Sequence, residues 1–313
     1  MAVDGFDLFA MTFATFTAAQ AGALAACGLA SAGLFALAWR KSSLGGTTLL
    51  APWNWSLVSL LAIATSEVLV GLGGSLSRSE WPVPLRFAAA MTTFCPMMAV
   101  LGAKRPQDRG WQFIVLSLWA ILSLPSFKWL LFGGVQEIHS ARFWFLVALT
   151  LVGAANGITT RFWPSSLLVC AGQMALVAPY LPATQCLLPG AQAPLSGLLA
   201  IVVAGGLLAS GLPRGAPAAK PLDRVWLDFR DAFGAVWALR VAERINASAA
   251  MHGWPVVLGW RGFRDRENGG PAEAVPEIAA DNLRTLLRRF VSPAWIDARL
   301  GERASEDLTA SIR

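Results

Sequence analysis

One carboxylate lies inside an otherwise apolar segment of this chain. Glu67 is near the middle of the apolar run 56–76. A carboxylate at mid-bilayer is costly, so its side chain should face the interior of a helix bundle and be protonated or paired. Its possible companions inside other apolar runs are Gln20, Asn156 and Gln173. This set predicts a proton or cation relay, a ligand contact, or a structural hydrogen bond from a protonated Glu67 to a neighbouring helix.

A short basic turn is the second candidate for binding. Lys104, Arg105 and Arg109 lie in a turn between two apolar runs, which also holds Pro106 and ends at Trp111. Lysine and arginine donate strong hydrogen bonds to phosphate oxygens, so this turn could contact a phosphate or a lipid headgroup. The other interpretation is an ordinary cytoplasmic turn, because such turns are enriched in Lys and Arg.

The sequence offers little for metal or cofactor chemistry. His139 and His252 lie outside the apolar runs, on opposite sides of the membrane in the topology given below, so they cannot share a metal. The four cysteines form no CxxC pair, and the chain has no GxGxxG, P-loop, HExxH or GxSxG motif. We therefore expect no cofactor, no metal site and no catalytic residues.

The uneven distribution of charge along the chain predicts the helices that hold these residues. Residues 1–212 carry 16 of the 44 charged residues, and only 14 % of the whole chain is charged, against about 25 % in soluble domains. This predicts an all-α polytopic membrane protein with about seven transmembrane helices, followed by a small, mainly helical cytoplasmic C-terminal domain. Each span needs about 20 apolar residues, and the expected spans are 9–38, 56–76, 87–103, 111–133, 143–160, 164–182 and 195–212.

The loops between these runs indicate an orientation. The first, third and fifth loops and the tail are the more basic, with Arg40, Lys41, Lys104, Arg105, Arg109 and Arg161 in the loops. The positive-inside rule then gives N-terminus out, seven spans and C-terminus in, and six or eight spans would invert one end. Pro96 and Pro125 should kink the third and fourth spans, because each removes one backbone hydrogen bond.

The last hundred residues predict a separate unit. A Pro/Gly/Ala linker over 213–221 precedes a tail domain over 222–313. Its first helix has an apolar face formed by Leu222, Val225, Trp226, Phe229, Phe233, Val236, Trp237 and Val241. The segment 254–263 predicts a strand or hairpin, and further helices follow over 277–291 and around Trp295. We favour a compact domain packed on the cytoplasmic loops. The alternative is a tail that lies on the membrane with the arginines of the second helix on anionic headgroups.

Three classes of function are compatible with these features. The first, which we favour, is a non-enzymatic membrane component that scaffolds, senses or assembles, with the tail as its cytoplasmic contact domain. The second is a transporter or channel that uses Glu67, and the third is a membrane-embedded enzyme acting on lipids. The expected partners are the lipid bilayer and other membrane subunits or a cytoplasmic protein; the net charge of +6 fits the positive-inside bias rather than nucleic acid. Arginine outnumbers lysine, as in GC-rich bacterial genomes, so we expect the inner (plasma) membrane.

Overall fold

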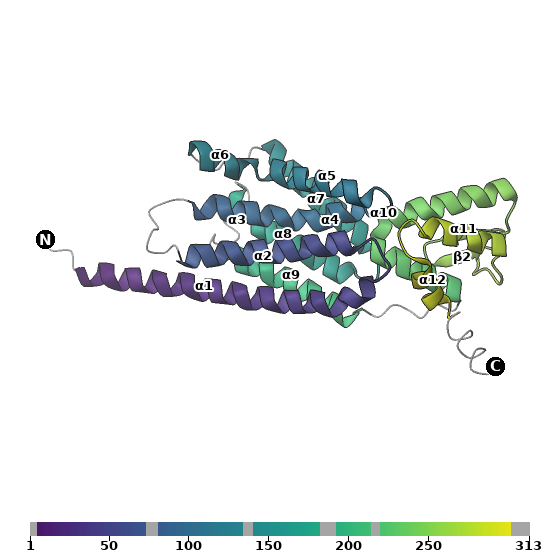
Figure 1. Ribbon diagram of the computed structural model, residues 1–313, viewed down its shortest axis with the longest axis horizontal. Coiled ribbons are helices and arrows are strands. Elements are labelled where there is room, and N and C mark those ends of the chain that lie inside the picture. Colours follow the sequence, from purple (N-terminus) through teal and green to yellow (C-terminus); the bar gives the residue numbers. More distant parts are fainter. Residues whose placement is uncertain (1–4, 73–80, 134–139, 182–191, 214–219, 302–313) are drawn as a thin grey trace.

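The computed structural model describes residues 5–72, 81–133, 140–181, 192–213 and 220–301, with side chains from residue 20 onward except that of Asp108. Helices α1 to α9 form an elongated bundle, and the C-terminal elements lie together at the end opposite the N-terminus (Figure 1). The bundle helices are α1 Gly5–Arg40, α2 Leu50–Leu72, α3 Pro82–Met91, α4 Cys95–Leu101, α5 Asp108–Leu122, α6 Leu124–Phe132, α7 Ser140–Ile158, α8 Trp163–Val177 and α9 Ala193–Ser210. Short 3-10 turns cover Lys41–Leu44, Thr92–Phe94 and Ala178–Tyr180.

Several helices are long and apolar enough to cross a membrane. Within the described ranges five qualify: Gln20–Leu44, Leu50–Leu72, Pro82–Leu101, Ser140–Ile158 and Ala193–Ser210. A sixth is possible if the bent pair of α5 and α6 is one span. The predicted span 164–182 corresponds to α8, whose 15 residues fall short of the roughly 20 that a span needs. The mostly helical, membrane-spanning class is therefore supported, and the count of seven remains a prediction.

Proline determines where two of the predicted spans break. Helices α5 and α6 meet at 52°, and Pro125 lies in the first turn of α6, where a missing N–H is tolerated. The predicted kink in this span is thus confirmed. Pro96 lies in the first turn of α4, directly after the 3-10 turn Thr92–Phe94. This third span also begins at Pro82 rather than at residue 87.

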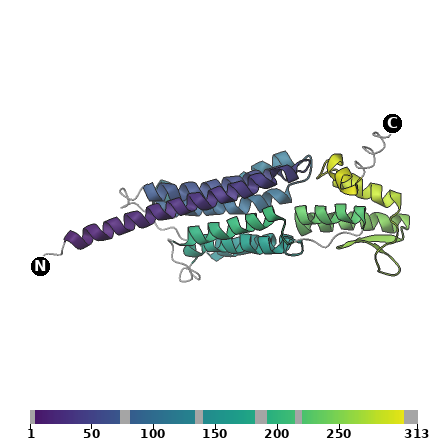
Figure 2. The same ribbon diagram turned by 90° about the horizontal axis from the view of Figure 1, so that it is seen from below.

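Close backbone contact holds two helices of the bundle together. A Cβ atom on Gly172 of α8 would lie 2.8 Å from the carbonyl oxygen of Gly197 on α9, and one on Gly197 would lie 2.9 Å from that of Gly172. Small residues at such a crossing let two backbones approach, which stabilises helix pairs in lipid. Helix α1 runs along the bundle and extends beyond it at the N-terminal end (Figure 2).

The C-terminal unit has its own apolar core. It consists of α10 Pro221–His252, an antiparallel hairpin of β1 Val256–Gly259 and β2 Gly262–Asp265, α11 Glu277–Leu287 and α12 Pro293–Leu300. The predicted apolar face of the first helix is confirmed as a packing face: the rings of Phe229, Phe233 and Trp237 contact the ring of Phe290, which follows α11. Trp226 is fully buried beside them. The hairpin predicted within 254–263 is also present.

Candidate functional site

Glu67 is paired with Arg86, which directly precedes the predicted third span 87–103. Arg86 on α3 donates from Nε to one carboxylate oxygen of Glu67 at 2.7 Å and from Nη2 to the other at 2.6 Å. Glu67 is only 4 % exposed. This parallel two-bond geometry is the strong form of an arginine–carboxylate pair. The polar partner was expected in span one, five or six, and that expectation was wrong because Arg86, four residues after Pro82, already belongs to the third span.

Glu67 does not lie in the middle of its helix, contrary to the expectation from the apolar run 56–76. Helix α2 begins at Leu50, six residues before the predicted span, so Glu67 lies near the end of α2 that faces away from the C-terminal unit. The helix begins early because Pro52 is in its first turn, where proline does not interrupt helical hydrogen bonding. The adjoining cavity measures about 10 Å³, which is room for at most one water molecule.

The structure does not bring the other three polar residues to Glu67. Gln20 is exposed on α1. The amide of Gln173 on α8 donates to the carbonyl oxygen of Thr93 at 2.8 Å. Asn156 on α7 accepts from the backbone N–H of Val236 on α10 at 3.0 Å. Glu67, Gln173 and Asn156 therefore have separate partners, and the four residues do not form one intramembrane site.

Gln173 has a structural task at the break in the third span. Pro96 has no N–H, so the carbonyl group of Thr92 lacks a donor four residues later. It accepts instead from the backbone N–H of Cys95 and from the hydroxyl of Ser59, the latter at 2.7 Å. The side-chain amide of Gln173 donates to the next carbonyl, that of Thr93. Irregular backbone in a membrane protein persists where neighbouring helices satisfy its polar groups.

The basic turn divides between solvent and the C-terminal unit. Lys104 lines a cavity that is completed by side chains of α10 and by the segment after α11. The backbone N–H of Arg105 donates to the carbonyl oxygen of Arg289 at 2.9 Å. Arg105 and Arg109 are both exposed. Of the three basic residues predicted to contact a phosphate or headgroup, only Lys104 lines this cavity.

Main-chain hydrogen bonds attach the C-terminal unit to the loop after α1. Thr47 and Val291 form an antiparallel β-bridge. On either side of it the N–H of Thr48 donates to the carbonyl of Phe290 at 2.9 Å, and the N–H of Ser292 donates to the carbonyl of Gly46 at 2.6 Å. Gly46 has a φ of +77°, and a Cβ atom there would collide with the side chain of Ser292. The loop thus has the backbone that this contact requires.

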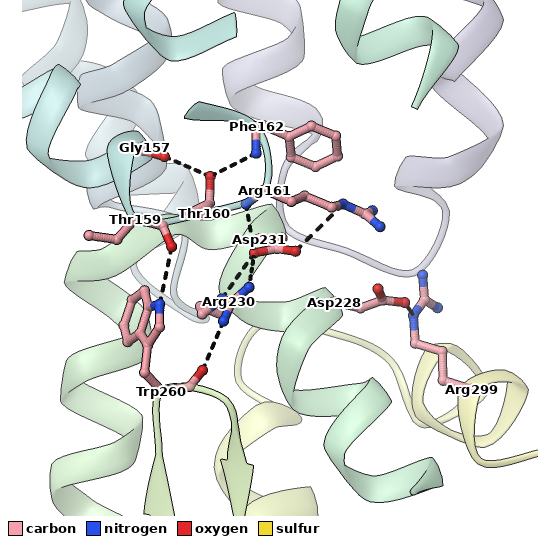
Figure 3. A network of polar contacts seen from close by, with 10 residues as sticks. All are labelled: Gly157, Thr159, Thr160, Arg161, Phe162, Asp228, Arg230, Asp231, Trp260 and Arg299. Atoms are coloured by element: carbon pink, nitrogen blue, oxygen red, sulfur yellow. Dashed lines mark hydrogen bonds and ion pairs between the residues drawn. The ribbon is translucent and has the colours of Figure 1, made fainter. Parts of the chain in front are cut away.

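A buried ion network attaches the same unit to the loop after α7 (Figure 3). The side chain of Asp231 on α10 is 5 % exposed and accepts from Nε and Nη2 of Arg230 at 3.0 and 2.7 Å. It also accepts from the backbone N–H of Arg161 at 3.3 Å, and the Nε of Arg161 lies 3.5 Å from its other oxygen. One carboxylate thus compensates two guanidinium groups, one from each side of the junction between the helix bundle and the C-terminal unit.

The hairpin turn continues this contact. The indole N–H of Trp260 donates to the carbonyl oxygen of Thr159 at 3.1 Å, and Nη1 of Arg230 donates to the carbonyl oxygen of Trp260 at 2.8 Å (Figure 3). Within the C-terminal unit, Arg299 of α12 pairs with Asp228 of α10 at 2.8 Å. The polar side chains at the junction therefore hold α10, the hairpin and α12 in one orientation relative to the bundle.

A break in α10 lies against Asn156 of α7. Gly234 has a φ of +79° and a ψ of −178° inside the helix, and a Cβ atom there would overlap the amide of Asn156. The same amide accepts from Val236, two residues further on. Asn156 was predicted as an intramembrane companion of Glu67, but it is part of this junction because α7 ends only two residues later.

Sequence reasoning missed three groups of residues in these contacts. Arg86 could have been found from Pro82, since a helix starting there places residue 86 in its second turn. Asp231 and Arg161 are far apart in sequence, and no local pattern indicates their pairing. Arg240, Arg244 and Arg289 line the Lys104 cavity, and no local pattern brings them to the turn that holds Lys104.

No protein family, curated protein or solved structure matches the chain. Among the residues that the structure describes, no group of three or more His, Cys, Asp or Glu side chains is placed to hold a metal. The functional interpretation therefore depends on the chain's own geometry.

Proposed function

We propose that this protein is a non-enzymatic, multi-pass membrane component whose C-terminal domain is held on the cytoplasmic end of its helix bundle, where it serves as an assembly or sensing module. In this proposal the chain crosses the inner membrane seven times, with its N-terminus outside. The observation that carries it is the attachment of one C-terminal domain to three separate loops, around Thr47, Arg105 and Arg161.

The location of these three loops supports the orientation. They are the first, third and fifth loops of the sequence, which contain Arg40, Lys41, Lys104, Arg105, Arg109 and Arg161. Since each of them contacts the same domain, they lie at the same end of the bundle together with the basic tail. Basic loops on one side of a membrane protein are typical of the cytoplasmic face.

The alternative of a transporter or channel that uses Glu67 is less well supported. A relay requires water or exchangeable partners beside the carboxylate. Glu67 instead forms two short hydrogen bonds with Arg86, and the adjoining cavity has space for about one water molecule. We therefore assign the Glu67–Arg86 pair a role in fastening α2 to α3. The lipid-enzyme alternative has no specific contact in its favour.

Reporter fusions test the topology. A reporter fused after residue 190 should be active only outside the cytoplasm, and one fused after residue 313 only inside. The same side for both positions would exclude a seven-span chain with its N-terminus outside.

Photo-crosslinking tests the assembly role. Leu239, Met251 and Ile278 are large apolar side chains that are exposed on the C-terminal domain. A photoreactive amino acid at these positions in the native membrane should give at least one crosslink to a second protein. The same probe at Glu267, an exposed polar position near the hairpin, serves as the control. Absence of protein crosslinks from all three apolar positions would contradict the proposal.

A further inference from the structure

We propose that the cavity between the turn after α4 and the C-terminal domain binds a phosphate-bearing anion through Lys104, Arg240, Arg244 and Arg289. This inference is independent of the proposed function, since it depends only on the shape and charge of the cavity. The ligand chemistry is a phosphate group, carried either by an anionic lipid headgroup or by a small soluble molecule.

The cavity is built from both sides of the junction. Lys104 and Gln107 come from the turn, Trp237, Arg240 and Arg244 from one face of α10, and Arg289 from the segment after α11. Its volume is about 330 Å³, at the lower end of the range for small-molecule sites, which starts at about 300 Å³. The backbone bond from Arg105 to Arg289 closes one edge and fixes Lys104 and Arg289 relative to each other.

Positive charge is concentrated in this cavity. Four cations and one carboxylate, Glu243, line it. In the described part of the chain, none of these four cations has a carboxylate within ion-pair distance. Burial together with the charges of Arg289, Arg244 and Arg240 lowers the pKa of Lys104. The cations are therefore close enough to repel one another, and a bound anion would relieve that repulsion.

The side chains suit phosphate in particular. The guanidinium of Arg240 lies over the ring of Trp237, 5.0 Å from its centroid, which restricts its orientation. Arginine presents paired donors that match phosphate oxygens, and lysine adds a compact charge. The amide of Gln107 can supply one further donor. Lys104 follows the third span by three residues, so a headgroup at the membrane surface and a soluble phosphate can both reach the cavity.

The first arm of the test measures soluble phosphate. The purified full chain in phosphatidylcholine nanodiscs is titrated calorimetrically with inorganic phosphate and with pyrophosphate. If the phosphate is soluble, the wild-type chain binds at least one of them. Arg240→Gln and Arg244→Gln each weaken binding about tenfold or more, because each removes a charged hydrogen bond. Arg266→Gln, which removes the same charge at an exposed position outside the cavity, leaves the affinity unchanged.

The second arm measures lipid. The same chain is reconstituted in phosphatidylcholine with about 30 mol % phosphatidylglycerol, whose headgroup phosphate is the probe. The lipids retained on the chain are identified by native mass spectrometry. If the phosphate belongs to a lipid, phosphatidylglycerol is enriched on the wild-type chain and on Arg266→Gln, and the enrichment is lost in Arg240→Gln/Arg244→Gln. The proposal is overturned if both arms show no binding, or if Arg266→Gln reduces binding as much as the cavity variants do.

Discussion

The carboxylate of Asp231 accepts a hydrogen bond from the backbone N–H of Arg161 at 3.3 Å and faces the side chain of the same arginine at 3.5 Å. Asp231 belongs to the C-terminal domain and Arg161 to a loop of the membrane bundle. The other close partner of Asp231 is Arg230, its neighbour on α10. One buried carboxylate therefore links the two parts of the molecule and compensates cations from each.

Replacing Asp231 should destabilise the junction strongly. We expect Asp231→Asn to lower the free energy of unfolding by about 3 kcal/mol, because removing one partner from a buried ion network leaves the other charges uncompensated. Denaturant titration of the detergent-solubilised chain, followed by tryptophan fluorescence, measures this loss. Asp281→Asn is the matched control, since Asp281 is exposed beside Arg284 on α11, and should change stability by less than about 1 kcal/mol. Equal losses in the two variants would show that the junction network adds no stability.

Gly234 should tolerate no side chain. Alanine there requires a backbone conformation that essentially only glycine adopts, and its Cβ atom would also overlap Asn156. We expect Gly234→Ala to cost at least about 3 kcal/mol of stability. Gly253→Ala is the control, because Gly253 also has a positive φ, of +63°, but has open space around its Cβ position. That variant should cost about 1 kcal/mol. A similar cost for both would mean that neither the backbone conformation of Gly234 nor its contact with Asn156 excludes a side chain.

The sequence predicted local structure well and long-range contacts poorly. The helix with Trp226, Phe229 and Phe233 on one face, and the hairpin after it, could be found because periodicity and β-propensity are local properties. Pro125 likewise indicated the bend between α5 and α6. The partners of Glu67 and Asp231 could not be found, since pairing between distant segments depends on how helices are arranged. Lys104 was correctly placed in a basic turn, but nothing in that turn indicates the arginines of α10 that surround it.

Phosphate affinity at the cavity should depend on pH through Lys104. Its pKa is lowered by burial and by the three neighbouring arginines, so it loses its proton at a lower pH than an ordinary lysine. We therefore expect phosphate binding to weaken as the pH rises towards the usual pKa of lysine, where phosphate keeps a charge near −2.

The ligand-free chain should show the opposite trend. Because the folded state holds this proton less tightly than the unfolded state, stability should rise with pH across the same interval. Calorimetric titration and denaturant unfolding at several pH values measure the two effects. Lys104→Gln should remove both pH dependences. If the pH dependence persists in this variant, another group is responsible.

The Glu67–Arg86 pair should stabilise the contact between α2 and α3. We expect Glu67→Gln and Arg86→Gln each to lower the melting temperature of the chain in detergent. The double variant should lose less than the sum of the two, with a coupling energy of about 1–3 kcal/mol. Additive losses would mean that the two side chains do not interact in the folded protein.

The central claim is that the C-terminal domain is attached to the loops of the bundle in the membrane, and a disulfide between Thr47→Cys and Val291→Cys tests it most directly. These positions form an antiparallel β-bridge, whose Cα spacing of about 4.5–5.5 Å suits a disulfide.

All four native cysteines precede residue 214, so a protease site placed within 214–219 separates them from the C-terminal fragment. Val291→Cys alone and the pair Thr47→Cys with Met251→Cys, an exposed residue near the end of α10, serve as controls. After mild oxidation of native membranes and cleavage, the Thr47–Val291 pair should keep the two fragments together until a reductant is added, and the controls should not. Free fragments from the Thr47–Val291 pair without reductant would contradict the account.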